Sequence, residues 1–127
     1  HLSSRNPGVL DFQDAVIGPI TYDLVSLLRD CYITLSSDLV ELLFDKFYEN
    51  LNEKIRNRYS KNRFKRFFDL MGIQRHLKAI GIFSRLNYRD GKQNYLKDIP
   101  RTLNYIYHVS ENYKELNFLR ELIANIK

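Results

Sequence analysis

The sequence lacks what would be needed for disulfides, membrane spans or zinc sites. Cys31 is the only cysteine among the 127 residues, which excludes an internal disulfide. No run of about eighteen apolar residues occurs, and a membrane-spanning helix needs one. The His, Cys and Asp residues nowhere have the spacing of zinc ligands, and no Ser, His and Asp pattern suggests a nucleophilic triad. Repeats and low-complexity linkers are also lacking, and we expect a cytoplasmic protein.

The composition is sufficient for one folded domain. Hydrophobic residues make up 44% of the chain, and a chain of this length can bury roughly two-thirds of its unfolded surface. We therefore expect residues 1–127 to form a single domain. Its fold class is predicted to be mainly α, with a short β-hairpin near the N-terminus, because turn residues from Ser3 to Gly8 separate two short apolar segments.

Apolar residues recur every three or four positions over most of the remaining chain, which predicts helices. The first helix is predicted from Tyr22 to about Ile33, with Thr21 as its N-cap, and the second from Asp38 to about Tyr59. Gly72 and Gly81 either permit close packing or mark a break in the helical pattern that follows. A turn at 89–92 then precedes helices over 100–113 and 115–126, the first of them opened by Pro100.

Cys31 falls on the apolar face of the first predicted helix. It shares that face with Leu24, Leu27 and Leu28. A small thiol in such surroundings is typical of a buried structural cysteine rather than a reactive one.

Two carboxylates follow the N-terminal apolar segment at a short interval. The segment ends at Asp11, and Asp14 comes three residues later. A strand that ends in Asp presents a rigidly held carboxylate to a hard cation such as Mg²⁺, while Phe12 can anchor the turn in the core. Taken alone, this pattern favours an Asp11 that caps the following turn over a metal ligand, because two acids at this spacing are common.

The longer string around these acids carries a resemblance. Residues 10–24, LDFQDAVIGPITYDL, resemble the metal-binding segment of the aminoglycoside phosphotransferase-like kinases. A second block agrees with the bacterial branch that phosphorylates the anomeric hydroxyl of N-acetylmuramate and N-acetylglucosamine: FFDLMGIQRHLK at 67–78, GIFSRL at 81–86 and YRDGK at 88–92.

This resemblance implies the helical C-terminal lobe of a kinase-like phosphotransferase that uses ATP and Mg²⁺. It also implies that the N-terminal lobe and the catalytic loop with its general base lie upstream of His1, so that the chain holds no catalytic residue and is inactive alone. The roles it implies are metal binding for Asp11, cofactor binding for Asp11 and Asp14, bracing of the catalytic loop for Asp23, and sugar contacts for Arg85, Tyr88, Arg89 and Asp90. Ordinary helix-end polarity is the alternative for the last four.

The excess of positive charge, +5 overall, is concentrated between Lys46 and Arg66. One interpretation is a helical module that binds nucleic acid through phosphate contacts and base stacking; the favoured one is a solvated basic surface beside an apolar face. The basic residues are Lys46, Lys54, Arg56, Arg58, Lys61, Arg63, Lys65 and Arg66.

Within the kinase superfamily, aminoglycoside, choline and homoserine kinases remain alternatives to a sugar kinase.

Overall fold

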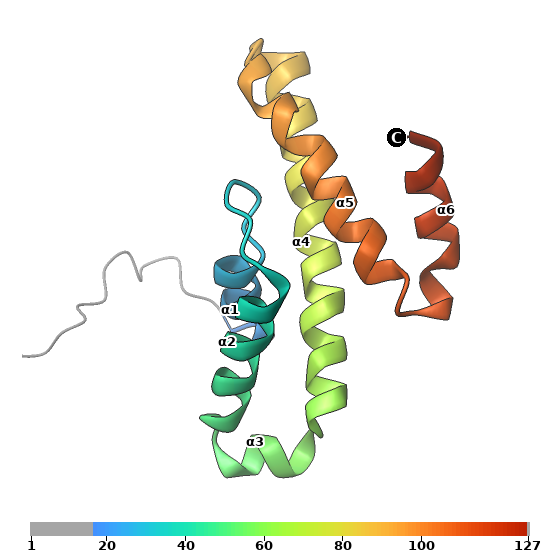
Figure 1. Cartoon of the computed structure of the whole chain (residues 1–127). Coiled ribbons are helices and arrows are strands. Elements are labelled where there is room, and N and C mark those ends of the chain that lie inside the picture. The colour runs from blue at the N-terminus through green and yellow to red at the C-terminus, as the bar shows by residue number, and fades with distance from the viewer. Residues whose placement is uncertain (1–16, 127) are drawn as a thin grey trace, which may run out of the picture.

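One long helix organises the fold. In the computed structural model, α4 (Lys61–Asp90) spans 30 residues, about 45 Å at 1.5 Å per residue. Helices α1 (Thr21–Leu28) and α2 (Ser37–Glu49) lie on one side of it and α5 (Ile99–Ser110) and α6 (Asn117–Ile126) on the other, and the short α3 (Glu53–Arg58) joins the end of α2 to the start of α4 (Figure 1). The 3₁₀ helices are η2 (Gln93–Asp98) and η3 (Lys114–Leu116).

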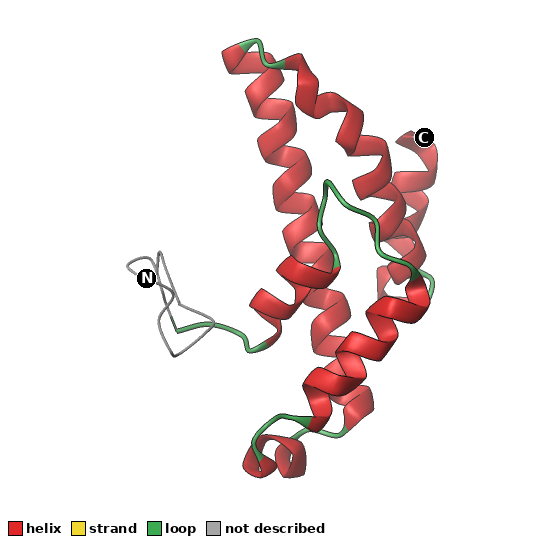
Figure 2. Ribbon diagram, turned by 60° about the vertical axis from the view of Figure 1, so that its left-hand side comes forward, coloured by secondary structure: helices red, strands yellow, loops and turns green. Residues whose placement is uncertain are grey.

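The structure describes residues 17–126. This part of the chain contains helices and connecting loops and no strand (Figure 2), which confirms the mainly α fold class. The predicted β-hairpin, Asp11 and Asp14 lie outside the described residues. Among residues 17–126, no helix has the length and apolar character needed to cross a membrane.

The apolar core has two parts, and α4 contributes to both. In the first part, side chains from α1 and α2 pack against the start of α4, and Val25, Phe64 and Phe68 are fully buried. In the second part, side chains from α5 and α6 join Ile73 of α4. The two clusters comprise Leu24, Val25, Leu28, Phe44, Phe64 and Phe68 in the first, and Ile73, Ile106, Val109 and Ile123 in the second.

Helix α4 continues through both of its internal glycines. Gly72 allows a close approach, because a Cβ there would lie 2.9 Å from Nη1 of Arg29. Gly81 has no neighbour that explains it. The helix begins where the Ser60 side chain accepts a hydrogen bond from the Arg63 backbone N–H, and it ends at Gly91 with φ of +64°. Glycine suits this left-handed cap because it carries no Cβ.

The first predicted helix ends five residues earlier than expected, at Leu28. Asp30 Oδ1 accepts hydrogen bonds from the backbone N–H groups of Tyr32 (2.6 Å) and Ile33 (3.0 Å), which turns the chain out of the helix. Cys31 therefore lies half-buried in a loop and not on a helical face. Two further details were wrong: Ile20 occupies the N-cap position in place of Thr21, and Leu27 is exposed.

The second predicted helix is divided into α2 and α3. The Asn50 side chain donates to the Lys46 carbonyl at 2.7 Å and so terminates α2. The Asn52 side chain then accepts from the Lys54 backbone N–H at 2.9 Å and caps α3. The helix predicted to reach Tyr113 ends at Ser110, and η3 precedes the last helix.

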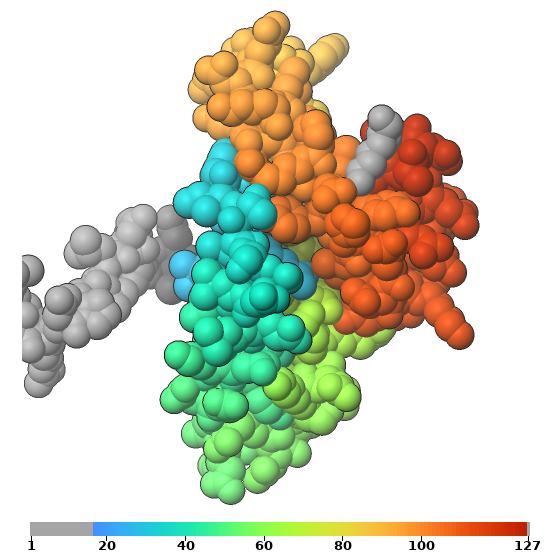
Figure 3. Space-filling model, in the orientation of Figure 1, coloured from blue at the N-terminus to red at the C-terminus, as the bar shows by residue number. Residues whose placement is uncertain are grey.

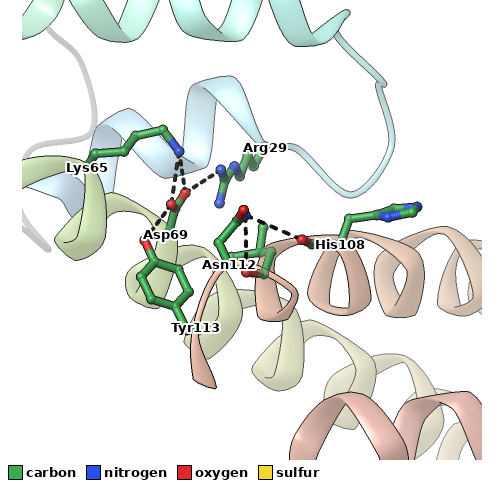
Figure 4. A network of polar contacts seen from close by, with 7 residues as sticks. Arg29, Lys65, Asp69, His108, Asn112 and Tyr113 are labelled. Carbon is green, nitrogen blue, oxygen red and sulfur yellow. Dashed lines mark hydrogen bonds and ion pairs between the residues drawn. The ribbon is translucent and has the colours of Figure 1, made fainter. Parts of the chain in front are cut away.

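A buried carboxylate fastens α1 to α4. Asp69 is 2% exposed, and its two oxygens accept from Arg29 Nη2 at 2.5 Å, Lys65 Nζ at 2.8 and 2.9 Å, and the Tyr113 hydroxyl at 2.8 Å (Figure 4). These partners come from the end of α1, from α4 itself and from the loop after α5. One carboxylate thus joins three segments that are far apart in the sequence.

Arg29 is fixed by more than its ion pair. Its guanidinium lies 4.4 Å from the centroid of the Phe68 ring, a favourable cation–π arrangement. Its backbone carbonyl accepts a hydrogen bond of 2.9 Å from His76 Nε2, so this nitrogen carries the proton. His76 also stacks on Tyr105. The exit of α1 is therefore held by side chain and backbone together.

Replacing Asp69 by Ala should destabilise the protein strongly, since Arg29 would remain buried without its counterion. Breaking a buried pair in this way costs about 3–5 kcal/mol of unfolding free energy. Urea denaturation followed by circular dichroism measures this. Asp45→Ala, which removes the half-buried partner of the exposed Lys61, is the matched control and should change stability little. Equal effects of the two substitutions would contradict the structural role of Asp69.

His76 should make stability depend on pH. Burial lowers its pKa below the ordinary value of 6.5, so the unfolded chain protonates this ring at a higher pH than the folded protein does. As the pH falls through 6.5 toward that lowered pKa, the unfolded state binds more protons and the free energy of unfolding decreases. Between about pH 7 and pH 5, the unsubstituted protein should lose more stability than His76→Gln. Parallel pH profiles of the two proteins would refute this.

Candidate functional site

The site residues of the described part begin at the first turn of α1, which lies within the string that resembles a kinase metal segment. Asp23 is exposed there, where its charge complements the helix dipole. Within residues 17–126 its carboxylate makes no hydrogen bond or ion pair. A bracing role toward a catalytic loop stays a prediction.

Tyr22, next to Asp23, contacts a residue that lies far along the chain. The Arg75 guanidinium is 4.1 Å from the centroid of the Tyr22 ring. Within residues 17–126 no carboxylate lies within ion-pair distance of Arg75, so its charge is oriented by the ring and not neutralised. Both residues belong to the strings quoted above, but their contact spans 53 positions, and sequence reasoning missed it.

A cavity of about 240 Å³ opens between α1, the loop that follows it and α4. Its wall combines polar and apolar groups, as ligand sites commonly do. Arg75 stands on one side and Asp30 on the loop side, while Phe83 supplies apolar surface. Six of its residues are used below: Ser26, Arg29, Asp30, Arg75, Ile82 and Phe83.

The groups of this cavity differ in reactivity. Burial raises the pKa of the Cys31 thiol above its ordinary value, so the thiolate is disfavoured and a nucleophilic role is not supported. Asp30 is held by the two backbone N–H groups described above. The Ser26 hydroxyl donates to the Tyr22 carbonyl at 2.9 Å and keeps its acceptor lone pairs. The cavity is thus equipped for binding rather than for covalent chemistry.

A larger cavity, of about 340 Å³, lies between α2, α4 and α5. Arg29 and Lys65 line it, and both are ion-paired with Asp69. Their charges are therefore neutralised within the fold and are not available to a ligand. Its lining includes Leu28, at the end of α1, but no residue from the start of α1.

The four predicted sugar-facing residues lie together at the far end of α4. All are exposed, Tyr88 by 94%, and Arg89 pairs with its neighbour Asp90 at 2.7 Å. This end of the helix protrudes at the top of the molecule (Figure 3). Fourteen residues separate Arg89 from Arg75, about 21 Å along the helix. The described structure does not bring Arg85, Tyr88, Arg89 or Asp90 to the cavity beside α1, and their role stays a prediction.

The basic stretch from Lys46 to Arg66 is partly engaged within the fold. Lys61 pairs with Asp45 at 2.7 Å, Lys65 with Asp69, and Arg66 with Glu115. The guanidinium groups of Arg58 and Arg63 each lie 5.4 Å from the centroid of the Tyr59 ring. Because that ring is flanked by cations, it is poorly placed to stack on a base. These contacts favour the solvated-surface interpretation over nucleic-acid binding.

No group of three or more His, Cys, Asp or Glu side chains within residues 17–126 could hold a metal ion. Asp11 and Asp14 lie outside these residues, and their roles in metal and cofactor binding stay predictions.

The chain is similar to known proteins over nearly its whole length. It is 48% identical over 126 residues to an N-acetylmuramate/N-acetylglucosamine kinase of Neisseria meningitidis serogroup B, with 98% of this chain and 38% of that protein covered. It is 45% identical to a kinase of the same name from Pseudomonas putida, with 98% and 37% covered. One from Caulobacter vibrioides is 33% identical over 99 residues, 78% of this chain and 26% of that protein.

The chain thus spans less than two-fifths of the length of these relatives. A comparison with solved structures found no match. The sequence profile described as the phosphotransferase enzyme family matches residues 2–60, which include the acidic string and helices α1 to α3. On these similarities, the chain belongs to the phosphotransferase enzyme family.

Proposed function

We propose that this chain is the helical C-terminal lobe of an ATP-dependent phosphotransferase that acts on a sugar hydroxyl. The observation that carries the proposal is the 48% identity to an N-acetylmuramate/N-acetylglucosamine kinase over 98% of the chain. The relatives are more than twice as long, and we assign the ATP-covering lobe and the general base to the part that this chain does not span.

Asp11 is assigned as the ligand of Mg²⁺, with Asp14 binding the cofactor beside it. When bound, Mg²⁺ neutralises charge on the phosphates of ATP as the phosphoryl group is transferred. The contribution of this chain is to hold the carboxylates at a fixed place relative to the acceptor, since positioning supplies much of the catalysis in phosphoryl transfer.

The anchoring of α1 supports this assignment. Seven residues join Asp14 to Tyr22 and the first turn of α1. Beyond that turn, Val25 is fully buried against α4, and Arg29 is held by Asp69 at 2.5 Å. A helix secured at its core face and at its end is a firm support for a metal-binding loop. Asp23, exposed at the same end, is free to brace a catalytic loop.

The acceptor proposed is the anomeric hydroxyl of N-acetylmuramate or N-acetylglucosamine, in the cytoplasm and in cell-wall recycling. Aminoglycosides are polycations, and a site for them should be strongly acidic. The net charge of +5 and the cation Arg75 in the cavity argue against that alternative. Choline, also a cation, is disfavoured on the same ground.

In the intact protein, Asp11→Asn should abolish phosphoryl transfer and leave the fold unchanged, because the amide keeps the side-chain shape but not the charge that Mg²⁺ requires. ADP release with Mg-ATP and N-acetylglucosamine measures the activity, and thermal unfolding monitors the fold. Asp38→Asn, an exposed carboxylate in the first turn of α2, is the matched control and should retain activity. Unchanged turnover in Asp11→Asn would refute the metal assignment.

The intact protein should also discriminate among acceptors. We expect ADP release with N-acetylmuramate and N-acetylglucosamine, and none above background with choline or kanamycin. Omitting Mg²⁺ should remove the activity. Turnover on kanamycin with none on the acetylated sugars would show that the substrate assignment is wrong.

A further inference from the structure

We propose that Arg75 binds the carboxylate of N-acetylmuramate in the cavity between α1 and α4, and so acts as the residue that distinguishes the two acetylated sugars. This inference rests on the proposed sugar-kinase function. It adds a recognition residue that neither the sequence patterns nor the family similarity assigns.

The two sugars differ in a chemically simple way. N-acetylmuramate carries a lactyl ether that ends in a carboxylate, and N-acetylglucosamine has a neutral hydroxyl at the same carbon. A protein that accepts both gains affinity for the first if one cation meets the carboxylate, and it need not change any other contact. Arginine is well suited to this, because its planar guanidinium can donate two parallel hydrogen bonds to one carboxylate.

Arg75 is the cation of this cavity that is available for such a contact. Two arginines line the cavity, Arg29 and Arg75. The charge of Arg29 is neutralised by Asp69 at 2.5 Å. Arg75 has no carboxylate within ion-pair distance among residues 17–126, and its side chain is only half-buried.

The contact with Tyr22 prepares Arg75 for binding. At 4.1 Å from the ring centroid, the aromatic face supports the guanidinium without using its N–H groups in an ion pair, so they can donate to a carboxylate. The orientation is set before a ligand arrives, which lowers the entropic cost of forming the ion pair. A lysine or an unsupported arginine would lose more side-chain freedom in making the same contact.

The position of Arg75 fits an acceptor site. Tyr22 lies eight residues after Asp14, so the contact brings Arg75 to the start of the helix that follows the proposed metal loop. Arg85 and Arg89 are about 15 Å and 21 Å further along α4. Arg75 is the α4 cation whose guanidinium lies over a ring of α1, that of Tyr22.

The rest of the cavity wall suits a sugar. Ser26 and Asp30 offer acceptors for hydroxyl groups, and Ile82 and Phe83 offer apolar surface for a ring face or an acetyl methyl. The turn amides of Tyr32 and Ile33 are bonded to one oxygen of Asp30, and their dipoles offset part of its repulsion toward a bound carboxylate. At about 240 Å³, the space is of the size for a monosaccharide portion rather than a larger ligand.

The experiment compares both sugars in the intact protein. Arg75→Gln keeps much of the side-chain length and removes the charge. It should lower kcat/KM for N-acetylmuramate by about 10- to 100-fold, the usual cost of a lost charge-assisted hydrogen bond. For N-acetylglucosamine, kcat/KM should stay within about twofold, because no carboxylate is present to lose its partner. Arg75→Lys should fall between the two proteins on N-acetylmuramate.

Lys78→Ala is the matched control. It removes one positive charge from an exposed position three residues further along the same helix, and it should leave the ratio of the two kcat/KM values unchanged. Its use separates a direct contact from a general electrostatic effect on an anionic substrate.

Three results would overturn the inference. An equal loss on both sugars would indicate a role in ATP binding or in positioning α1, and unchanged kcat/KM on N-acetylmuramate would exclude the contact. A matching loss of selectivity in Lys78→Ala would indicate long-range attraction.

If the unsubstituted protein turned over neither sugar, the proposed function itself would fail. Turnover on both sugars combined with unchanged selectivity in Arg75→Gln would remove only the present inference.

Discussion

The ion pair between Arg29 and Asp69 is the interaction on which the arrangement of the other elements depends. Asp69 is buried on α4, and each of its hydrogen-bonding partners belongs to a different stretch of chain. A carboxylate in an apolar interior is costly unless it is paired and hydrogen-bonded. This requirement is met only when α1, α4 and the loop after α5 come together.

That packing explains how a helical body can support the acidic string that precedes α1. The core face of α1 is fixed by Val25 and its end by Arg29, while Ser26 lines a cavity between α1 and α4. One short helix thus connects the acidic string to the body and also forms part of a ligand-sized hollow. The family similarity over residues 2–60 covers this helix and the string together.

The sequence predicts the helices well where local patterns decide them, and poorly where distant groups do. The Gly91 cap and the opening of α5 by Pro100 follow from residue type alone. The early end of α1 follows only in part, because Asp30 binds the nearby N–H groups of Tyr32 and Ile33, but the carbonyl groups of residues 29 and 31 accept from His76 and Arg101, which are 47 and 70 positions away. The same holds for the site: Tyr22 and Arg75 are each visible in a motif, but only the fold shows that they touch.

The separation between Arg29 and Asp69, 40 positions, has a consequence for biosynthesis. As the chain leaves the ribosome, the apolar face of α1 emerges well before the α4 residues that cover it. At a translation rate of about 5–20 residues per second, the interval between the synthesis of Arg29 and that of Asp69 is roughly two to eight seconds. During that interval Leu24, Val25 and Leu28 are without Phe64 and Phe68, the α4 side chains of their cluster. The burial of the α1 core face is therefore completed only after the first turns of α4 have been synthesised.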